Sequence, residues 1–230
     1  MKQAHIFIFI ISFLFLKNSV LLAQQQIDSV DAREKYGIRV GADLSKPLRS
    51  LIDDDYSGFE LVGDYRVYEN WYAAAELGFD EFFYKEENIN GSTKGSYFKL
   101  GANYNAYTNW IGMQNEIFAG LRFGFSSFSQ QLDGYTVYSH PYFPADIREV
   151  NIEYNNLTAS WIELQLGTKV EILGNLFLGF HFQLKKRISA TEPTNFANLY
   201  IPGFHRTYDG SSIGVGYGYS ITYLIPFYKK

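Results

Sequence analysis

His181 is the residue whose type and surroundings best suit acid–base chemistry. It lies in a segment of alternating apolar and polar residues, and Gly179 and Gln183 share its side of that segment. Hydrolysis would need a nucleophile beside this histidine and a third group to orient its ring. Ser160 is a distant candidate for the nucleophile, but no spacing in the sequence brings it to His181. A histidine packed in the interior is the favoured interpretation, so we predict no catalytic residue.

The remaining polar residues predict neither a metal centre nor a cofactor site. His140 and His205 fall in loops and have no partners at the spacing of metal ligands. The chain has no cysteine, which excludes thiolate ligands, disulfides and a lipid-modified cysteine. It carries 20 basic and 24 acidic residues, a net charge of −4, and no concentrated basic face. Nucleic acid is therefore not an expected partner.

The stretch 213–227 indicates how the chain is organised. Large apolar residues occupy every second position, and glycine, serine or threonine fills most positions between them. Because the side chains of a strand alternate between two faces, this strand has one bulky apolar face and one face of small groups. Large groups facing lipid and small groups facing the interior of a narrow barrel fit this pattern.

Seven further segments show similar alternation, which makes about eight strands. They are 36–44, 59–68, 71–84, 98–106, 117–125, 161–172 and 176–185. Long loops are predicted at 45–57, 85–95, 130–156 and 186–211, with short connections between the other strands. This order is typical of an all-β transmembrane antiparallel up-and-down β-barrel with long extracellular loops and short periplasmic turns. Closure of the sheet leaves no strand edge to be satisfied in hydrocarbon.

The N-terminal residues predict export. After Lys2, an apolar run extends from Ile6 to Leu16, and Ala23 precedes three glutamines. A basic start, a short apolar run and a small boundary residue are typical of a secretory signal peptide, whereas a membrane-spanning helix needs roughly 20 apolar residues. The expected organisation is a signal peptide at 1–23, a periplasmic segment at 24–35 and an outer-membrane barrel at 36–230.

Basic and acidic residues are mixed on the inward face of the predicted strands. Eight strands enclose a space that side chains can fill, and unpaired buried charges are costly, so we expect ion pairs rather than an open pore. If the turn at Gly174 pairs Ile172 with Leu176, Glu163 lies opposite Lys185, and we predict a cross-strand ion pair between them. The predicted interior network comprises Arg39, Arg66, Glu76, Arg122, Glu163, Lys169 and Lys185.

Aromatic and basic residues mark the two ends of the predicted barrel. One interfacial aromatic belt is expected near the short turns, with Tyr36, Tyr65, Tyr68, Trp71, Tyr104, Tyr107, Trp110, Tyr223 and Phe227. The other is expected near the long loops, with Phe79, Phe83, Phe98, Phe125, Phe128 and Trp161. Lys185, Lys186 and Arg187 lie at the predicted outer mouth. Such cations are candidates for contact with lipopolysaccharide phosphates, and a solvated rim is the simpler alternative.

These features together resemble a known class of proteins. A signal peptide, alternating strands, long loops and a last strand with Tyr219, Ile221, Tyr223, Ile225 and Phe227 resemble the small outer-membrane β-barrels of the OmpA/OmpX kind. In detail the chain resembles an uncharacterised barrel family of the Bacteroidota. The resemblance implies the outer membrane of a Gram-negative bacterium, contact with outer-membrane lipid and lipopolysaccharide, and recognition of the C-terminal strand by the barrel-assembly machinery.

The sequence thus predicts a monomeric integral outer-membrane barrel with a structural or surface-interaction role. No enzymatic activity and no cofactor are expected. Two alternatives stay open. One is a lipid A-modifying barrel enzyme that uses His181, and the other is a soluble lipocalin-like barrel that binds an apolar ligand inside.

Overall fold

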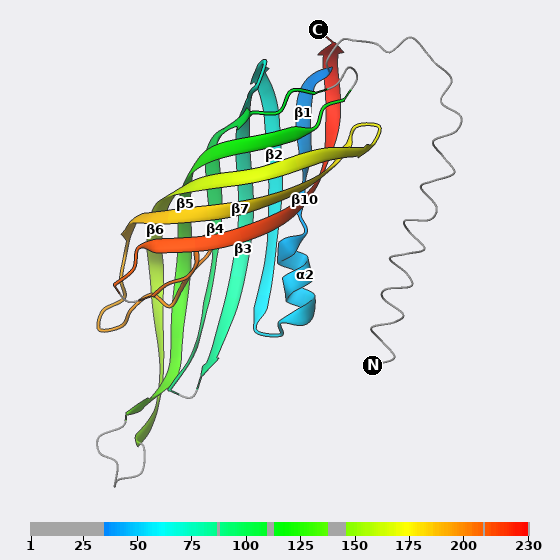
Figure 1. Ribbon diagram of the computed structural model, residues 1–230. Coiled ribbons are helices and arrows are strands. Elements are labelled where there is room, and N and C mark those ends of the chain that lie inside the picture. The colour runs from blue at the N-terminus through cyan, green and yellow to red at the C-terminus, as the bar shows by residue number, and fades with distance from the viewer. Residues whose placement is uncertain (1–34, 87, 110–112, 138–145, 209, 230) are drawn as a thin grey trace, which may run out of the picture. The chain divides into compact units, whose positions relative to one another are not determined.

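The chain forms a closed antiparallel β-barrel of eight strands, which confirms the predicted all-β barrel architecture. The computed structural model describes residues 35–86, 88–109, 113–137, 146–208 and 210–229. Eight strands pair in the ring β1-β10-β7-β6-β5-β4-β3-β2, so that each wall strand pairs with the next one along the chain (Figure 1). Their bounds are β1 Lys35–Asp43, β2 Tyr56–Tyr68, β3 Trp71–Glu86, β4 Ile89–Asn105, β5 Glu116–Val137, β6 Asp146–Leu173, β7 Leu176–Ala190 and β10 Ile213–Lys229.

The two faces of the wall are inverted relative to a water-soluble protein. Outward-facing Leu121, Phe182 and Val215 expose 60%, 60% and 73% of their surface. Inward-facing Arg122 and Glu163 are buried. The alternation along each strand sends bulky apolar groups out and charged groups in, as the sequence pattern predicts.

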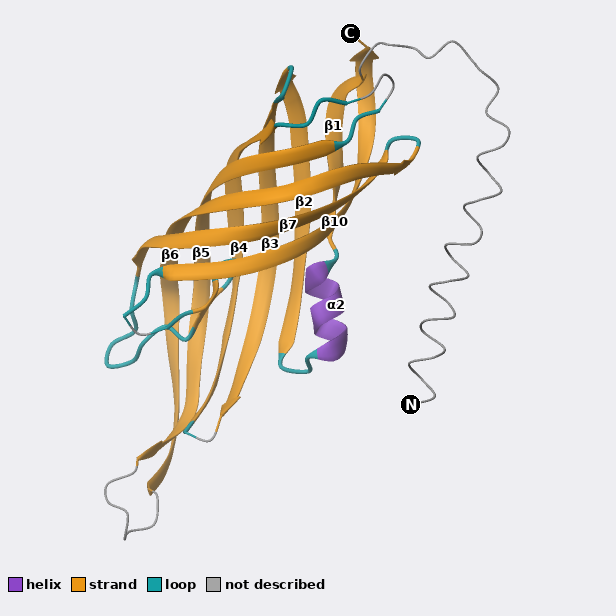
Figure 2. Ribbon diagram, in the orientation of Figure 1, coloured by secondary structure: helices purple, strands orange, loops and turns teal. Residues whose placement is uncertain are grey.

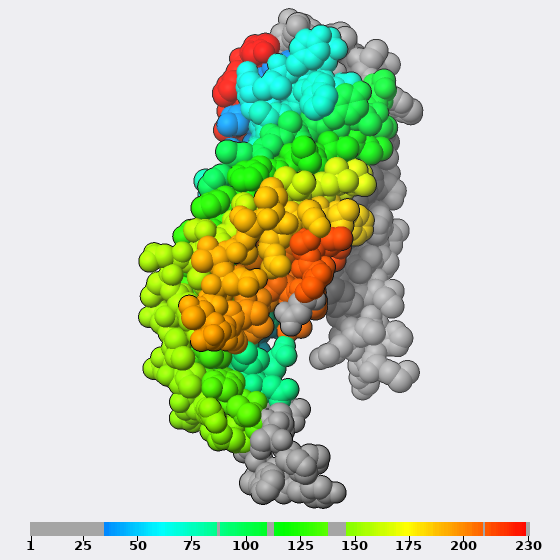
Figure 3. All heavy atoms as spheres, turned by 90° about the vertical axis from the view of Figure 1, so that its left-hand side faces the viewer, coloured from blue at the N-terminus to red at the C-terminus, as the bar shows by residue number. Residues whose placement is uncertain are grey.

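Strands extend beyond the predicted boundaries at the long-loop end. The expected loop 85–95 is a hairpin, in which Lys85 pairs with Asn90 and the Tyr84 hydroxyl lies 3.1 Å from Thr93 Oγ1. The expected loop 130–156 is mostly strand, because β5 and β6 continue past the barrel as an arm (light green in Figure 3). Polar sequence here marks where the strands leave the apolar zone of the wall. It does not mark where backbone pairing ends.

The expected loop 45–57 contains a helix, α2 (Ser45–Ile52), coloured purple in Figure 2. Pro47 lies in its first turn, where a missing backbone N–H costs nothing. Leu48, Leu51 and Ile52 share its exposed face, while Lys46 on the opposite face is buried. The helix therefore repeats the inversion of the strands, with its apolar side outward. In the described part of the chain, no helix has the length and apolarity to cross a membrane.

The predicted aromatic belts need three corrections. Trp161 and Phe128 are buried inside the barrel, because they share the inward register of Glu163 and Arg122. Tyr36 is also buried, since a β-bulge between Tyr36 and Gly37 shifts the register of β1 against β10. Trp110 and the predicted signal peptide 1–23 lie outside the described residues. So does the predicted segment 24–35, apart from Lys35, which is the first residue of β1.

Candidate functional site in the barrel lumen

Four buried charged side chains form a cluster towards the short-turn end of the lumen. Arg39 Nε lies 2.6 Å from Asp64 Oδ1, and Arg39 Nη2 lies 2.5 Å from Glu116 Oε1. Lys169 forms a second ion pair with Asp64. The Arg39 guanidinium also lies 4.6 Å from the centroid of the Tyr72 ring. Because β1 and β5 lie on opposite sides of the ring, these pairs cross-link the barrel through its interior.

A second cluster fills the middle of the lumen. Lys99 Nζ lies 3.1 Å from Glu60 Oε2 and 2.5 Å from Glu76 Oε2. Arg122 Nε lies 3.0 Å from Glu76 Oε1. The Tyr97 hydroxyl donates to Glu60 Oε2 at 2.5 Å. Each buried carboxylate thus has a cation and further donors, which is what makes burial of charge tolerable.

The predicted cross-strand pair between β6 and β7 is present. Glu163 and Lys185 are register partners, and Lys185 Nζ lies 3.9 Å from Glu163 Oε2. Gln165 Nε2 donates to Glu163 Oε1 at 2.7 Å. Lys185 Nζ also donates to the backbone carbonyl of Gly203 at 2.8 Å. Lys185 therefore ties the wall to the long connection between β7 and β10.

Six of the predicted network residues lie in the buried ion pairs of these clusters. These are Arg39, Glu76, Arg122, Glu163, Lys169 and Lys185. Arg66 lies at the short-turn end, 4.6 Å from the centroid of the Tyr36 ring, and donates to the carbonyl of Glu69 at 2.5 Å. The network also includes Glu60, Asp64, Lys99 and Glu116. Their positions in the alternating pattern of the sequence indicate that they face inward.

Asp80 organises the long-loop end of the lumen, and its central role was not foreseen from the sequence. Its Oδ1 accepts hydrogen bonds from the Tyr56 hydroxyl at 2.6 Å and from Lys46 Nζ at 3.1 Å. Its Oδ2 accepts from the Tyr200 hydroxyl at 3.1 Å and from the Gly203 amide at 2.9 Å. One carboxylate thus joins β2, β3, α2 and the connection between β7 and β10.

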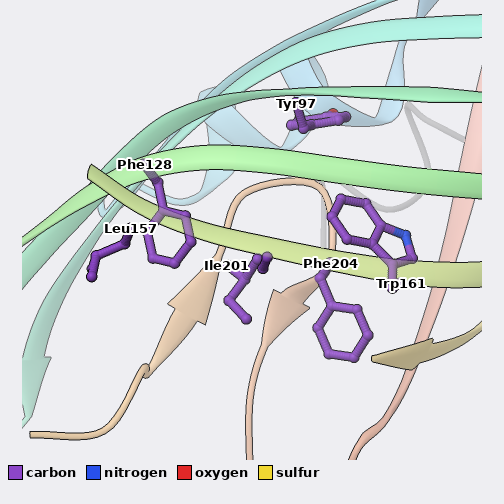
Figure 4. Packing of buried hydrophobic residues seen from close by; sticks show 7 residues of the cluster. Tyr97, Phe128, Leu157, Trp161, Ile201 and Phe204 are labelled. Carbon is purple, nitrogen blue, oxygen red and sulfur yellow. The ribbon is translucent and has the colours of Figure 1, made fainter. Parts of the chain in front are cut away.

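That connection folds into the barrel as a plug, defined here as residues 191–208. It contains the short strands β8 (Tyr200–Ile201) and β9 (His205–Arg206), which pair with each other. Ile201 and Phe204 are buried against the wall residues around Trp161, whose ring centroid lies 6.0 Å from that of Phe204 (Figure 4). The predicted loop 186–211 is therefore an internal element and not a free extracellular loop along its whole length.

His205 holds the plug against α2. Its Nε2 lies 3.0 Å from Lys46 Nζ, and because the ammonium group can only donate, this nitrogen acts as the acceptor. His205 has a φ of 84°, a left-handed conformation that is uncommon for a residue other than glycine. Burial, followed by the charges of Lys185 and Lys46, holds the pKa of His205 well below its ordinary value. The plug therefore docks with this imidazole neutral.

Acidification is expected to release the plug. The pKa of an undocked His205 is the ordinary histidine value, about 6.5, so below that pH the undocked residue binds a proton and the docked residue does not. Docking is therefore stable above about pH 6.5 and weakens as the pH falls. The charged groups that act on His205 are the cations Lys185, Lys46, Lys99 and Arg49, and each opposes a second positive charge. The ring of Tyr200 stacks on the imidazole, with 6.2 Å between the ring centroids. Hydrogen exchange of the plug amides, corrected for intrinsic pH dependence, should rise about tenfold between pH 7 and pH 5.5.

His205→Asn is the matched control for this titration. Asparagine tolerates left-handed φ and offers an acceptor oxygen to Lys46, but it does not titrate. Plug exchange in this variant should be insensitive to pH over the same window. Equal pH dependence in both proteins would show that another group controls docking.

His181 and Ser160 are not brought together. His181 is buried in the lumen, 2.8 Å from Gln183 Nε2, and its register partner on β6 is Gly167. The Ser160 hydroxyl lies 3.0 Å from that of Ser189 on the exposed side of the wall. Ser160 and His181 therefore lie on opposite faces of the wall and cannot pair. Among the described residues, no group of histidine, cysteine, aspartate and glutamate side chains is arranged to hold a metal ion.

The predicted cationic rim divides into an inner and an outer part. Lys185 is buried in the ion pair with Glu163, so it is not available at the surface. Lys186 is exposed and donates to Ser212 Oγ at 2.6 Å, and Arg187 is half-buried. Lys186 and Arg187 are therefore the two of the three that a surface ligand could reach.

Comparison with known proteins gives a family and no characterised relative. No curated protein matches the chain. One family model, described as a domain of unknown function (DUF6048), matches residues 3–230 and so covers nearly the whole sequence. The chain is therefore a member of the DUF6048 family, and the charge-filled barrel described above is the structure of this member.

Proposed function

We propose that this chain is an integral outer-membrane β-barrel of a Gram-negative bacterium, with a filled lumen and a structural or surface-interaction role. The observation that carries the proposal is the inverted wall. Apolar side chains cover the outside, whereas ionised side chains are buried inside. In water this arrangement would expose apolar area far beyond a few hundred Å² and would still bury charge. In a bilayer the same exposed residues meet hydrocarbon.

The filled lumen argues against a channel. Ion pairs bridge the interior near the short-turn end and at its middle, and the plug docks on Asp80 at the other end. Because these ion-paired side chains span the lumen, they leave no room for a wide aqueous path. We therefore assign the working surface to the parts outside the wall, chiefly the β5–β6 arm.

The other proposed partners follow from the same placement. Recognition of β10 by the barrel-assembly machinery is supported by the outward row that ends in Phe227, which exposes 62% of its surface. Contact of Lys186 and Arg187 with lipopolysaccharide is supported by their position beyond the buried Lys185. The ring of wall strands closes within one chain, which supports a monomer.

Single cysteines test the membrane placement directly, because the chain has none of its own. Leu121 and Leu77 each expose 60% of their surface on the wall, so Leu121→Cys and Leu77→Cys are the reporters. After reconstitution and labelling with a fluorophore, acyl-chain nitroxide lipids should quench both reporters strongly. Aqueous iodide should quench them weakly.

Ile147→Cys is the matched control. Ile147 is also apolar and exposes 74% of its surface, but it lies on the arm beyond the wall, so iodide should quench it and nitroxide lipid should not. Release of the native protein without detergent, together with iodide quenching at Leu121, would favour the soluble lipocalin-like alternative. Large, stable single-channel conductance would contradict the filled lumen.

A further inference from the structure

The barrel wall has a seam where one strand stops early. β1 ends at Asp43, whose register partners are Ser220 on β10 and Glu60 on β2. Both neighbours continue towards the long-loop end, β10 as far as Ile213 and β2 as far as Tyr56. The segments 213–219 and 56–59 therefore have no strand partner on this side among the described residues.

Helix α2 covers the seam but forms no strand ladder with either neighbouring strand. It packs against both β2 and β10 (Figure 1). On the β2 side, the Ser50 hydroxyl accepts a hydrogen bond from the Gly58 amide at 3.1 Å. On the β10 side, the Leu44 amide donates to the carbonyl of Tyr219 at 2.5 Å. This is the last backbone contact on that edge that the described residues provide.

The edge of β10 beyond Tyr219 is open. Because backbone groups of a strand alternate in direction, those of Val215 and Tyr217 point to the same side as the carbonyl of Tyr219, towards α2. No hydrogen bond within the described part of the chain reaches these groups. An unpaired backbone group at membrane depth costs several kcal/mol unless a polar partner or water supplies the bond. The seam therefore presents backbone N–H and C=O groups that could bind a polar ligand.

A groove of about 420 Å³ runs along this edge. That volume lies within the range of about 300–1,000 Å³ seen for small-molecule sites. Its lining includes Lys46, Arg49, Phe182, His205, Val215 and Tyr217. Phe182, Val215 and Tyr217 belong to the outward apolar surface of the wall, whereas Lys46 and His205 belong to the lumen. The groove therefore connects the outside of the wall with the interior, past α2.

The charged groups that line the groove are basic. Lys46 forms an ion pair with Asp80, which is not one of the residues that line the groove. Arg49 is more exposed and stacks 4.0 Å from the centroid of the Tyr56 ring. Its Nε and Nη2 donate to Asp53, and its remaining N–H groups have no acceptor among the described residues. A guanidinium with open donors beside an apolar wall is suited to the oxygens of a phosphate.

We propose that this seam binds one anionic, phosphate-bearing membrane lipid. Its acyl chain lies along Phe182, Val215 and Tyr217, and its phosphate enters beside α2 to meet Arg49. The proposal rests on the membrane placement proposed above. A free anion would leave the apolar side of the groove unused, and a zwitterionic lipid would place its own cation beside Arg49 and Lys46. The anionic lipid matches both halves of the groove.

Lipid retention measured by native mass spectrometry tests the proposal. The full chain is reconstituted in nanodiscs of phosphatidylcholine with a minor share of phosphatidylglycerol, then released, and the bound lipid is counted. The native protein should retain phosphatidylglycerol selectively. Arg49→Gln should reduce that retention about tenfold, as loss of a charge-assisted hydrogen bond predicts. Gly216→Leu should also reduce retention by narrowing the groove from its lumen side, where the added side chain would meet the movable ends of Gln183 and Lys185.

Arg148→Gln is the matched control. Arg148 also pairs with an exposed aspartate, Asp146, but it lies on the arm far along the chain from the seam. This variant should retain lipid as the native protein does. Heat-modifiable gel mobility checks that all variants are folded barrels.

Each other outcome overturns the assignment in a distinguishable way. Equal retention by Arg49→Gln, Gly216→Leu and Arg148→Gln would exclude the seam while leaving the membrane placement intact. Equal retention of phosphatidylcholine would exclude selection by charge. Displacement of phosphatidylglycerol by inorganic phosphate alone would make the groove a site for free anions. If nitroxide lipids failed to quench the label on Leu121→Cys, the proposed membrane placement would be wrong. The proposed lipid site would then be wrong as well.

Discussion

Asp80→Asn is expected to undock both the plug and α2 and to destabilise the barrel by about 3–5 kcal/mol, the usual cost of breaking a buried ion pair by removing one partner. The carboxylate holds Lys46, two tyrosine hydroxyls and the Gly203 amide at once. Asparagine keeps one acceptor oxygen but presents an NH₂ group to donors, and it leaves the Lys46 ammonium without a counter-charge. The substitution therefore weakens one anchor that β2, β3, α2 and the plug share.

Urea unfolding in detergent micelles, together with protease cleavage within 191–208, measures this loss. Asp55→Asn is the matched control, because Asp55 also accepts from a lysine, Lys85, but at an exposed position. Solvent screens an exposed pair, so this variant should be close to the native protein in stability. If the two aspartate variants were equally stable, Asp80 would not be the anchor that its contacts indicate.

Lys99→Met is expected to cost a similar 3–5 kcal/mol, because it leaves Glu60 and Glu76 buried without their shared cation. Methionine fills much of the lysine volume, so the loss reports charge and not a cavity. The barrel should then unfold at lower urea concentration, and the heat needed to change its gel mobility should fall.

Adding Glu60→Gln to Lys99→Met should recover part of the stability. It removes the carboxylate that Lys99→Met leaves without a paired cation, since Glu76 keeps its ion pair with Arg122. The amide oxygen of glutamine can still accept the hydrogen bond from the Tyr97 hydroxyl. Glu60→Gln alone should be milder than Lys99→Met. A double variant less stable than either single one would show that the central cluster is not held by charge compensation.

The ring of strands could be predicted because its signal is periodic and repeated. Alternation fixes which residues face inward, and the short turn at Gly174 fixes the register, so the pair of Glu163 with Lys185 followed from counting. The same parity also places Trp161 inside. The prediction that Trp161 belongs to an aromatic belt was wrong, because strand register and not residue type decides which face a side chain occupies.

The helix and the plug could not be predicted in the same way. Eight residues are too few for a clear helical period, and the segment carries a proline and is followed by three aspartates, which favour a loop in isolation. The plug depends on Asp80, which is 120 residues or more from Tyr200 and Gly203 in sequence. Neither propensity nor spacing reports a contact of that range, so Lys46 and His205 were placed in loops.

The β5–β6 arm has a further consequence for how copies of this protein behave side by side. On β6, pairing with β7 begins at Ala159, so residues 146–157 present a free strand edge among the described residues. Bare edges invite intermolecular β-pairing and aggregation. Here the edge carries Asp146, Arg148, Glu149 and Glu153, and Asn151 and Asn156 break its regular path with φ values of 48° and 59°. Charge and irregular backbone thus keep neighbouring molecules from joining into shared sheets, even where barrels are crowded.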